Sequence, residues 1–163
     1  MKNATRLLLA ACLVLPFLGA CKKQEAAQET VKAPVTVPAT PTDENAWNAY
    51  LTDVVTRNLD NATSTYVYTL PAESSADFQG AYDRQLEKAE GDVERGGVEG
   101  TLLAFGGPNS AKSADLAVAA FSRAQPGAMK GVKVLFIGAQ ADSDRVKAAV
   151  DPSGATYKFV EAK

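Results

Sequence analysis

Hydrophobic positions change their spacing several times along the chain. Six aromatic and aliphatic residues recur at the spacing of one helix face in residues 47–59, and the same period returns in residues 78–93. Between them, residues 64–70 (STYVYTL) are rich in β-branched and aromatic side chains and stop at Pro71, which predicts a strand. This part of the chain is therefore predicted to run helix, strand, helix.

The same alternation continues to residue 163. Short, nearly continuous apolar runs such as VKVLFI are typical of strands covered on both faces, and an alanine-rich stretch between Asn109 and Pro126 favours a helix. We expect helices over residues 111–124 and from Asp142 or Ser143 to Val150, and strands over residues 101–105, 132–137 and 155–160.

The order of these elements predicts an α/β fold. Strands that alternate with helices form mainly parallel sheets joined by right-handed crossovers. We expect a small three-layer sandwich of about four mainly parallel strands with helices on both faces. A ferredoxin-like α+β arrangement is the alternative, in which the last strand pairs antiparallel.

The first residues have the pattern of an export signal. Lys2 and Arg6 precede an uncharged apolar run, residues 7–18, which is too short to span a bilayer comfortably. The run closes on Leu-Gly-Ala-Cys at residues 18–21, which resembles the lipobox of bacterial lipoprotein precursors. The resemblance covers residues 1–21 and implies cleavage between Ala20 and Cys21.

The resemblance also implies a lipid anchor on the Cys21 thiol, through which the protein is held at a membrane. A second match, Leu-Ala-Ala-Cys ending at Cys12, is the less favoured site because it would leave a shorter apolar run. Lys22 is not the aspartate that such lipoproteins use for inner-membrane retention. We therefore expect the periplasmic face of the outer membrane.

Behind the signal, residues 21–45 are expected to form a disordered linker rich in Pro, Ala and Thr, followed by a single domain over residues 46–163. Removal of the first 20 residues takes away Lys2 and Arg6, which leaves 15 Lys and Arg against 19 Asp and Glu, a formal charge of −4. A mildly acidic protein has no broad attraction for nucleic acid, so we expect no nucleic-acid partner.

The absence of histidine, and of free cysteine from the mature domain, excludes several kinds of catalysis and metal binding. The chain has no histidine, and its two cysteines are Cys12 and Cys21, so the mature domain would carry no thiol. Disulfides, Cys-His and Ser-His-Asp catalysis and His-ligated zinc are therefore excluded. We expect neither a cofactor nor a metal site.

One loop resembles a phosphate-binding motif. Residues 106–113 read GGPNSAKS after a predicted strand and before a helix, close to the P-loop pattern G-x-x-x-x-G-K-[ST], but Ala111 stands where the second glycine belongs. The loop is a candidate for binding an anion at a helix start; the alternative is a turn with Asn109 or Ser110 as the helix cap. The candidate residues are Gly106, Gly107, Asn109, Ser110, Lys112 and Ser113.

A second loop, residues 138–144, carries Asp142, Ser143 and Asp144, whose oxygens suit either a hard cation or a helix cap. The cap is favoured, because two carboxylates are few for a cation site.

Aromatic residues of the strand near residue 66 offer a further candidate surface. Tyr66 and Tyr68 share one face of this strand, and Val67 takes the other. Core packing is favoured, but at a sheet edge the two tyrosines would be exposed and able to contact a peptide or glycan.

Together these patterns predict a membrane-anchored periplasmic lipoprotein with a non-catalytic binding or scaffold domain in the cell envelope. An envelope protein or peptidoglycan is the expected partner. The alternative is a small envelope enzyme that uses carboxylates, or Lys112 with Ser113, at the loops that follow the strands.

Overall fold

The computed structural model describes residues 33–163. The predicted signal peptide, its cleavage site after Ala20 and the acylated Cys21 lie outside the described residues. In the described part of the chain, no helix is both long and apolar enough to span a bilayer. The elements are α1 (Glu44–Arg57), β1 (Ser64–Thr69), α2 (Phe78–Glu94), β2 (Thr101–Gly106), α3 (Ser110–Phe121), β3 (Lys133–Gly138), α4 (Gln140–Val150), the 3₁₀ turn η1 (Asp151–Ser153) and β4 (Thr156–Glu161).

The four strands form one parallel sheet in the order β1-β2-β3-β4. Each strand pairs with the next in the sequence, for example Tyr66 opposite Leu103 and Leu103 opposite Val134. The last strand is parallel to β3, with Phe136 opposite Phe159, which excludes the ferredoxin-like alternative. The predicted parallel α/β sandwich is confirmed.

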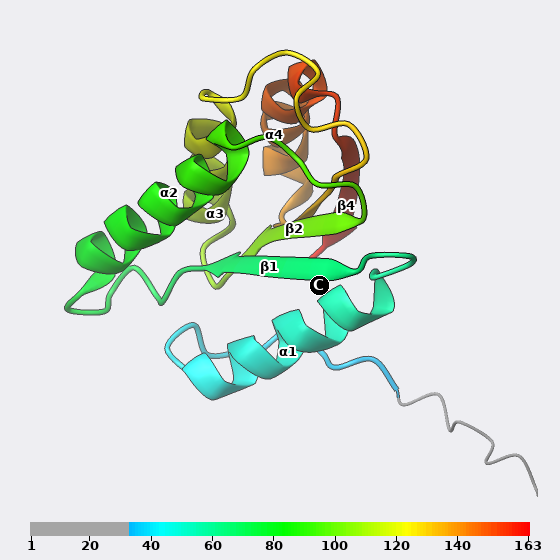
Figure 1. The fold of residues 1–163 in the computed structure, drawn as a ribbon. Helices are drawn as coiled ribbons and strands as arrows, with labels where there is room; N and C mark the ends of the chain where they lie inside the picture. The colour runs from blue at the N-terminus through cyan, green and yellow to red at the C-terminus, as the bar shows by residue number, and fades with distance from the viewer. Residues whose placement is uncertain (1–32) are drawn as a thin grey trace, which may run out of the picture. The chain divides into compact units, whose positions relative to one another are not determined.

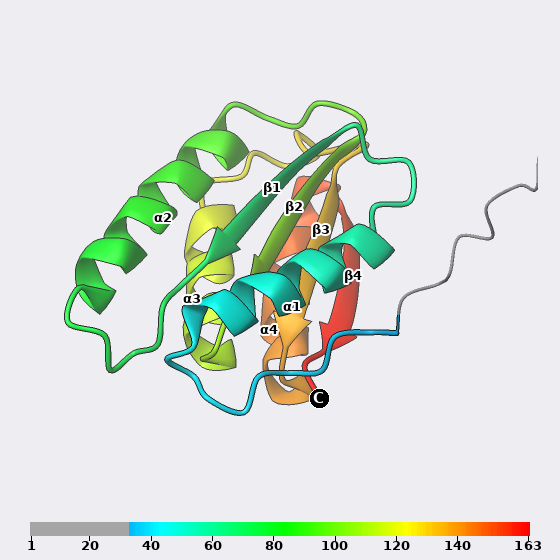
Figure 2. The ribbon, with the colours of Figure 1, turned by 90° about the horizontal axis from the view of Figure 1, so that it is seen from below.

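Helices α2, α3 and α4 cover one face of the sheet, and α1 covers the other (Figures 1 and 2). Because the strand order never reverses, the right-handed crossovers place α2, α3 and α4 on the same side. The first helix, α1, precedes the first strand and is no crossover, so it is free to cover the opposite face. The strand order also leaves no point at which the crossovers change direction, the usual place for a ligand in such folds.

The core has two halves, and alternate residues of the central strands point into each. Leu103 and Phe105 of β2 pack under α2 and α3, whereas Leu102 and Ala104 pack against α1. This alternation is why residues 101–105 are nearly all apolar. Strands β2 and β3 are thus covered on both faces, while β1 and β4 are the edges of the sheet.

Residues that precede α1 also pack on the domain. Val35 and Val37 contact the α1 half of the core, and the Val35 N–H donates to Asp53 Oδ2 of α1 at 3.1 Å. The Trp47 indole N–H donates to the Thr40 carbonyl at 3.2 Å. The last part of the segment expected to be linker is therefore held against α1.

The start of α4 differs from the prediction. The helix begins at Gln140, so the expectation that Asp142 or Ser143 caps it is wrong. Its N-cap is Ala139, which has no side chain that can accept a hydrogen bond. Ser110 Oγ of α3 instead accepts from the Ala139 N–H at 2.7 Å, a tertiary contact that the local sequence cannot reveal.

Candidate functional site

Residues 106–113, predicted to form an anion-binding loop, comprise the end of β2, the connection of residues 107–109 and the first turn of α3. Asn109 Oδ1 accepts from the Lys112 N–H at 3.1 Å, and the Asn109 carbonyl accepts from Ser113 Oγ at 3.1 Å. Ser113 is only 1% exposed. Asn109 is therefore the N-cap, one of the two residues that the sequence offered for this role.

The two glycines of this loop allow close packing. A Cβ at Gly106 would lie 2.9 Å from Leu51 Cδ2 of α1, and a Cβ at Gly107 would lie 3.2 Å from the carbonyl oxygen of Leu70. Both positions bring β2 and its loop against neighbouring elements. This close packing explains the glycines without a phosphate cradle.

Carboxylates of the protein itself contact side chains of the candidate anion-binding residues. Glu73 accepts from Asn109 Nδ2 at 2.7 Å and lies 3.6 Å from Lys112 Nζ. Ser110 Oγ donates to Asp142 Oδ2 at 2.6 Å. Asn109 and Lys112 are thus engaged by Glu73 of the loop after β1, and Ser110 by Asp142 of α4, which favours a role in holding together the segments that follow β1, β2 and β3.

The polar residues of the second candidate loop, residues 138–144, are also engaged by other groups of the domain. Asp142 accepts from Arg145 Nε at 3.1 Å and Nη2 at 2.9 Å, and Arg145 Nη1 donates to Asp115 of α3 at 2.6 Å. Ser143 is buried, and its hydroxyl lies 3.1 Å from the Tyr157 hydroxyl. Among residues 33–163, no group of three or more acidic residues is arranged to hold a metal ion.

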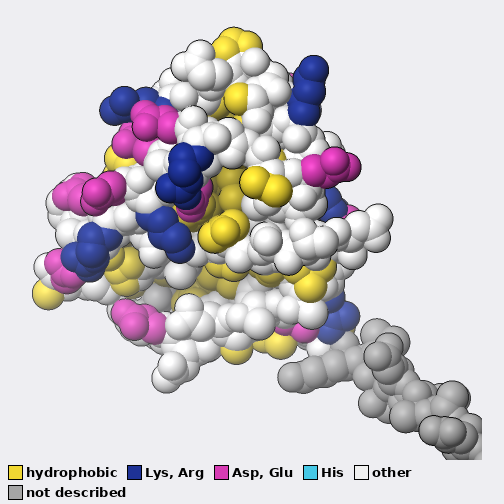
Figure 3. Space-filling model, viewed as in Figure 1, with side chains coloured by type: hydrophobic (Ala, Val, Ile, Leu, Met, Phe, Trp, Pro, Cys, Tyr) yellow, Lys and Arg dark blue, Asp and Glu magenta, His cyan; other side chains and the backbone are white. Residues whose placement is uncertain are grey.

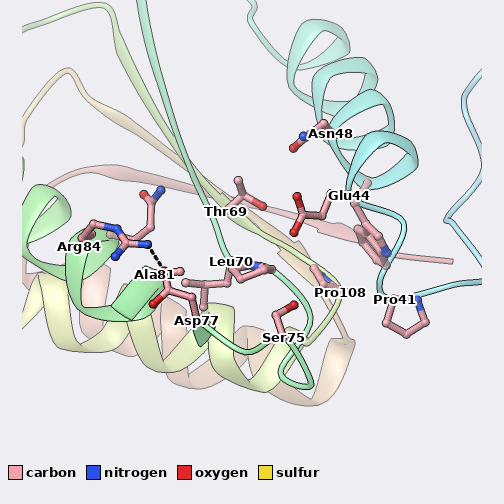
Figure 4. Close-up of a pocket in the computed structure, with 13 residues that line it drawn as sticks. Pro41, Glu44, Asn48, Thr69, Leu70, Ser75, Asp77, Ala81, Arg84 and Pro108 are labelled. Carbon is pink, nitrogen blue, oxygen red and sulfur yellow. Dashed lines mark hydrogen bonds and ion pairs between the residues drawn. The ribbon is translucent and has the colours of Figure 1, made fainter. Parts of the chain in front are cut away.

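A cavity of about 360 Å³ lies at the carboxyl end of β1, between the start of α1 and the start of α2 (Figure 4). It mixes apolar side chains with hydroxyl, amide and charged groups. Its lining residues are Pro41, Glu44, Trp47, Asn48, Thr69, Leu70, Pro71, Ser75, Asp77, Ala81, Arg84, Gln85 and Pro108.

Opposite walls of the cavity carry different polar groups. From α1, Glu44 and Asn48 point into it, and from α2, Arg84 forms an ion pair with Asp77 at 2.7 Å (Figure 4). Gln85 Oε1 is buried and has no hydrogen-bond partner within the described residues. A buried acceptor left unpaired costs about 1–3 kcal/mol, so a ligand that brings an N–H or O–H donor would recover this energy.

The free edge of β1 continues from this cavity along the face shown in Figure 3, where a band of hydrophobic side chains crosses the surface above α1. Tyr66 is 41% exposed and Val67 is 36% exposed. Tyr68 is fully buried: its ring stacks on Phe105 at 4.7 Å between centroids. Of the two tyrosines that the sequence placed on one face, the structure exposes the first and buries the second.

Lys88 of α2 lies over two aromatic rings of β1. Its Nζ lies 6.0 Å from the centre of the Tyr66 ring and 5.5 Å from that of Tyr68. The Tyr68 hydroxyl donates to Asp92 Oδ2 at 2.5 Å. Burial, and then this hydrogen bond, raise the pKa of the Tyr68 phenol, so the phenol stays neutral at physiological pH.

A smaller cavity of about 120 Å³ follows at the other end of α2, lined in part by Tyr66, Asp92, Arg95 and Val98. The two cavities and the exposed side chains of β1 thus lie along one strand and the helix beside it.

Sequence reasoning pointed to the loops after β2 and β3 and missed the cavity beside β1. The loop of residues 71–77 (PAESSAD) contains a capping-box pattern, Ser74 with Asp77, but no recognisable ligand-binding motif. The one available signal was that the strand predicted over residues 64–70 is free of charged residues and stops at Pro71.

Comparison with protein-family models, with curated proteins and with solved structures returns no match to this chain. What the domain does therefore has to be inferred from its own residues.

Proposed function

We propose that this chain is a bacterial lipoprotein, acylated at Cys21 and held at the periplasmic face of the outer membrane, whose α/β domain binds an envelope partner without catalysis. The lipobox-like residues 18–21 support the lipid anchor, and Lys22 supports the outer membrane as its location. Acyl chains on one cysteine provide strong attachment, because each buried CH₂ contributes about 0.8 kcal/mol.

The observation that carries the binding role is the cavity at the end of β1, whose lining residues include Gln85 with its unpaired Oε1. Concave sites with mixed apolar and polar lining are the usual places for ligands. The cavity adjoins an exposed strand edge, so the same surface can take a ligand larger than the cavity itself.

The enzymatic alternative has less support. Ser113 is buried and donates to the Asn109 carbonyl, and Lys112 is paired with Glu73, so neither offers a free nucleophile or base to a substrate. No observation favours this alternative over binding.

Anchoring is tested by metabolic labelling with palmitate and by membrane fractionation. Cys21→Ala should abolish labelling and release the protein from membranes, whereas Cys12→Ala should change neither. Labelling that depends on Cys12 would place the cleavage site nine residues earlier and contradict the proposal.

Binding is tested by in-cell photocrosslinking with the probe at Asn48, in the cavity wall on α1. The matched control is a probe at Ala148, which is exposed on α4. We expect a discrete crosslinked species from Asn48 and none from Ala148. Equal crosslinking from both positions, or none from either, would contradict a partner at this cavity.

A further inference from the structure

The free edge of β1 is an unsatisfied hydrogen-bonding surface. β1 pairs with β2 on one side and, within the described residues, with no strand on the other. In a parallel pair, alternate residues direct their N–H and C=O groups toward the neighbouring strand. Every second residue of β1 therefore directs its backbone groups away from the sheet.

The sequence of β1 carries none of the usual protection of an edge. Natural edges are protected by lysine, proline, inward-pointing charges or bulges, which prevent pairing with another strand. All six residues of β1 (STYVYT) are uncharged, none is proline, and Tyr66 and Val67 expose apolar surface. An edge of this composition is suited to accept a strand.

Helix α2 covers one side of the free edge of β1. Figure 2 shows α2 lying beyond the outer side of β1, so a strand added to β1 would run beneath this helix. Lys88 lies over the Tyr66 ring, and Gln85 lines the cavity at the end of the strand. We call this surface the β1 groove: the free edge of β1 with Gln85 and Lys88 of α2 above it and Asn48 of α1 below.

The charges of the β1 groove indicate the chemistry of its occupant. Arg84 is paired with Asp77, and Arg95 with Asp92, but Lys88 forms no ion pair within residues 33–163. A carboxylate on the occupant would pair with Lys88 at the middle of the groove. At the cavity end, Gln85 Oε1 requires a hydrogen-bond donor.

The position of α2 argues against a second copy of this chain as the occupant. Two copies joined through β1 about a two-fold axis would bring both α2 helices into the same layer over the joint, where each already extends beyond its own strand (Figure 2). A single extended segment without a helix of its own meets no such obstacle.

We propose that the β1 groove binds an extended peptide segment of another protein, which adds to the sheet as a fifth strand beside β1. The segment carries an acidic residue opposite Lys88 and an N–H donor that reaches Gln85 in the cavity. Backbone hydrogen bonds supply affinity and the side-chain contacts supply selectivity, as in other cases of strand addition. This inference rests on the proposed binding function and names its partner class.

The first test is selection of peptides from a random-sequence phage library against the mature, acylated protein in detergent micelles. We expect peptides with alternating β-branched or aromatic residues and a central Asp or Glu. Selection against Lys88→Glu should replace that acidic residue by Lys or Arg. Selection against Lys130→Glu, a change at an exposed lysine outside the groove, should leave the acidic preference unchanged.

The second test measures affinity and amide exchange with one selected peptide. Lys88→Glu should weaken the binding of an acidic peptide about tenfold, and Lys130→Glu less than about twofold. Bound peptide should slow hydrogen exchange of the β1 amides more than that of the β4 amides.

Three results would overturn the inference: no enrichment, binding that protects another element, or a dimer joined through β1 in sedimentation experiments without peptide. If the Asn48 probe still captures a partner in these cases, the binding function stands and only strand addition fails. If neither the probe nor the library finds a partner, both fail.

Discussion

The two edge strands of the sheet, β1 and β4, differ in how they are protected against pairing with another strand. β4 (TYKFVE) carries Lys158 and Glu161, and its Tyr157 hydroxyl donates to the Ser143 carbonyl of α4 at 3.1 Å. β1 carries no charge of its own, and the lysine that lies over its Tyr66 and Tyr68 rings comes from α2. Since charged side chains on an edge discourage pairing, β4 is less suited than β1 to accept an additional strand.

Both edges are nevertheless attached to the core in a similar way. One aromatic residue of each stacks on the neighbouring inner strand, Tyr68 on Phe105 and Phe159 on Phe136. One tyrosine hydroxyl of each bonds to a helix of the larger helical layer. The openness of β1 is therefore a property of its outward surface and not of weak attachment.

The largest expected effect comes from removing the β2 ring on which Tyr68 of β1 stacks. Phe105→Ala should lower the free energy of unfolding by about 3–5 kcal/mol, because Phe105 is fully buried and supports Tyr68. Phe159→Ala, which removes the partly buried ring that stacks on Phe136 from β4, should cost less. Urea unfolding followed by circular dichroism measures both, and an equal cost would mean that the two edges are not packed as described.

Removing the phenol of Tyr68 has a smaller effect. Tyr68→Phe should cost about 1–2 kcal/mol at neutral pH, because Asp92 loses a hydrogen-bond donor in a partly buried place. Tyr157→Phe makes the matched change on β4. If unfolding free energies show no loss for Tyr68→Phe, the hydroxyl contributes no net stability.

Tyr68 also makes the stability of the folded protein depend on pH. The pKa of Tyr68 is raised in the folded state, by burial first, so the folded protein keeps a proton that the unfolded chain releases near pH 10. Stability should therefore be complete below pH 10 and decrease as the pH rises further. Tyr68→Phe should make that decrease less steep in urea titrations between pH 9 and pH 11; an unchanged slope would assign the effect to other tyrosines.

Exchanging the edge charges should alter association more than stability. Val67→Lys gives β1 a charge of the kind that β4 has, and Lys158→Val removes one from β4. Each should change the unfolding free energy by no more than about 0.5 kcal/mol, as is usual at exposed positions. Val67→Lys should abolish peptide binding at the β1 groove, and Lys158→Val should promote self-association in sedimentation; unchanged behaviour of both variants would mean that charge does not govern these edges.

The smallest effect concerns Asp60, near the start of β3 and β4. Its carboxylate pairs with Lys133 and lies 4.0 Å from Lys158, and the hydrogen bond from Lys133 lowers its pKa. The stability it contributes is present above its unfolded pKa near 3.8 and is lost as the pH falls through its lower folded value. Asp60→Asn tolerates the positive φ of 48° and should slightly flatten the acid side of a stability profile measured by urea unfolding between pH 2 and pH 6; a steeper profile would contradict the pairing.

Much of the fold follows from local pattern. Residues 101–105 and 132–137 are strands because a continuous apolar run satisfies burial on both faces, and residues 78–93 form a helix because their apolar positions share one face. Helix ends were less predictable. Asp142 has the composition of a cap, yet it accepts from Ser110 across 32 positions of sequence.

The candidate site was predictable only in part. The loop of residues 106–113 was correctly placed between a strand and a helix, but Glu73, which pairs with its Lys112 and Asn109, comes from a different loop. No local pattern identifies a partner 36 or more positions away. The cavity beside β1 could not be predicted for the same reason, because α1, β1 and α2 each supply part of its wall.

The sequence by itself determined the kinds of element, their order, the absence of histidine and thiol chemistry from the predicted mature domain, and the expectation of a lipid anchor at Cys21. These follow from residue types and from spacing within short segments. Only the tertiary structure decided which strands lie at the edges, which of Tyr66 and Tyr68 is exposed, and that Lys88 stands over β1 without a carboxylate partner within the described residues. Edge and interior are properties of strand order, which depends on contacts between segments far apart in the chain.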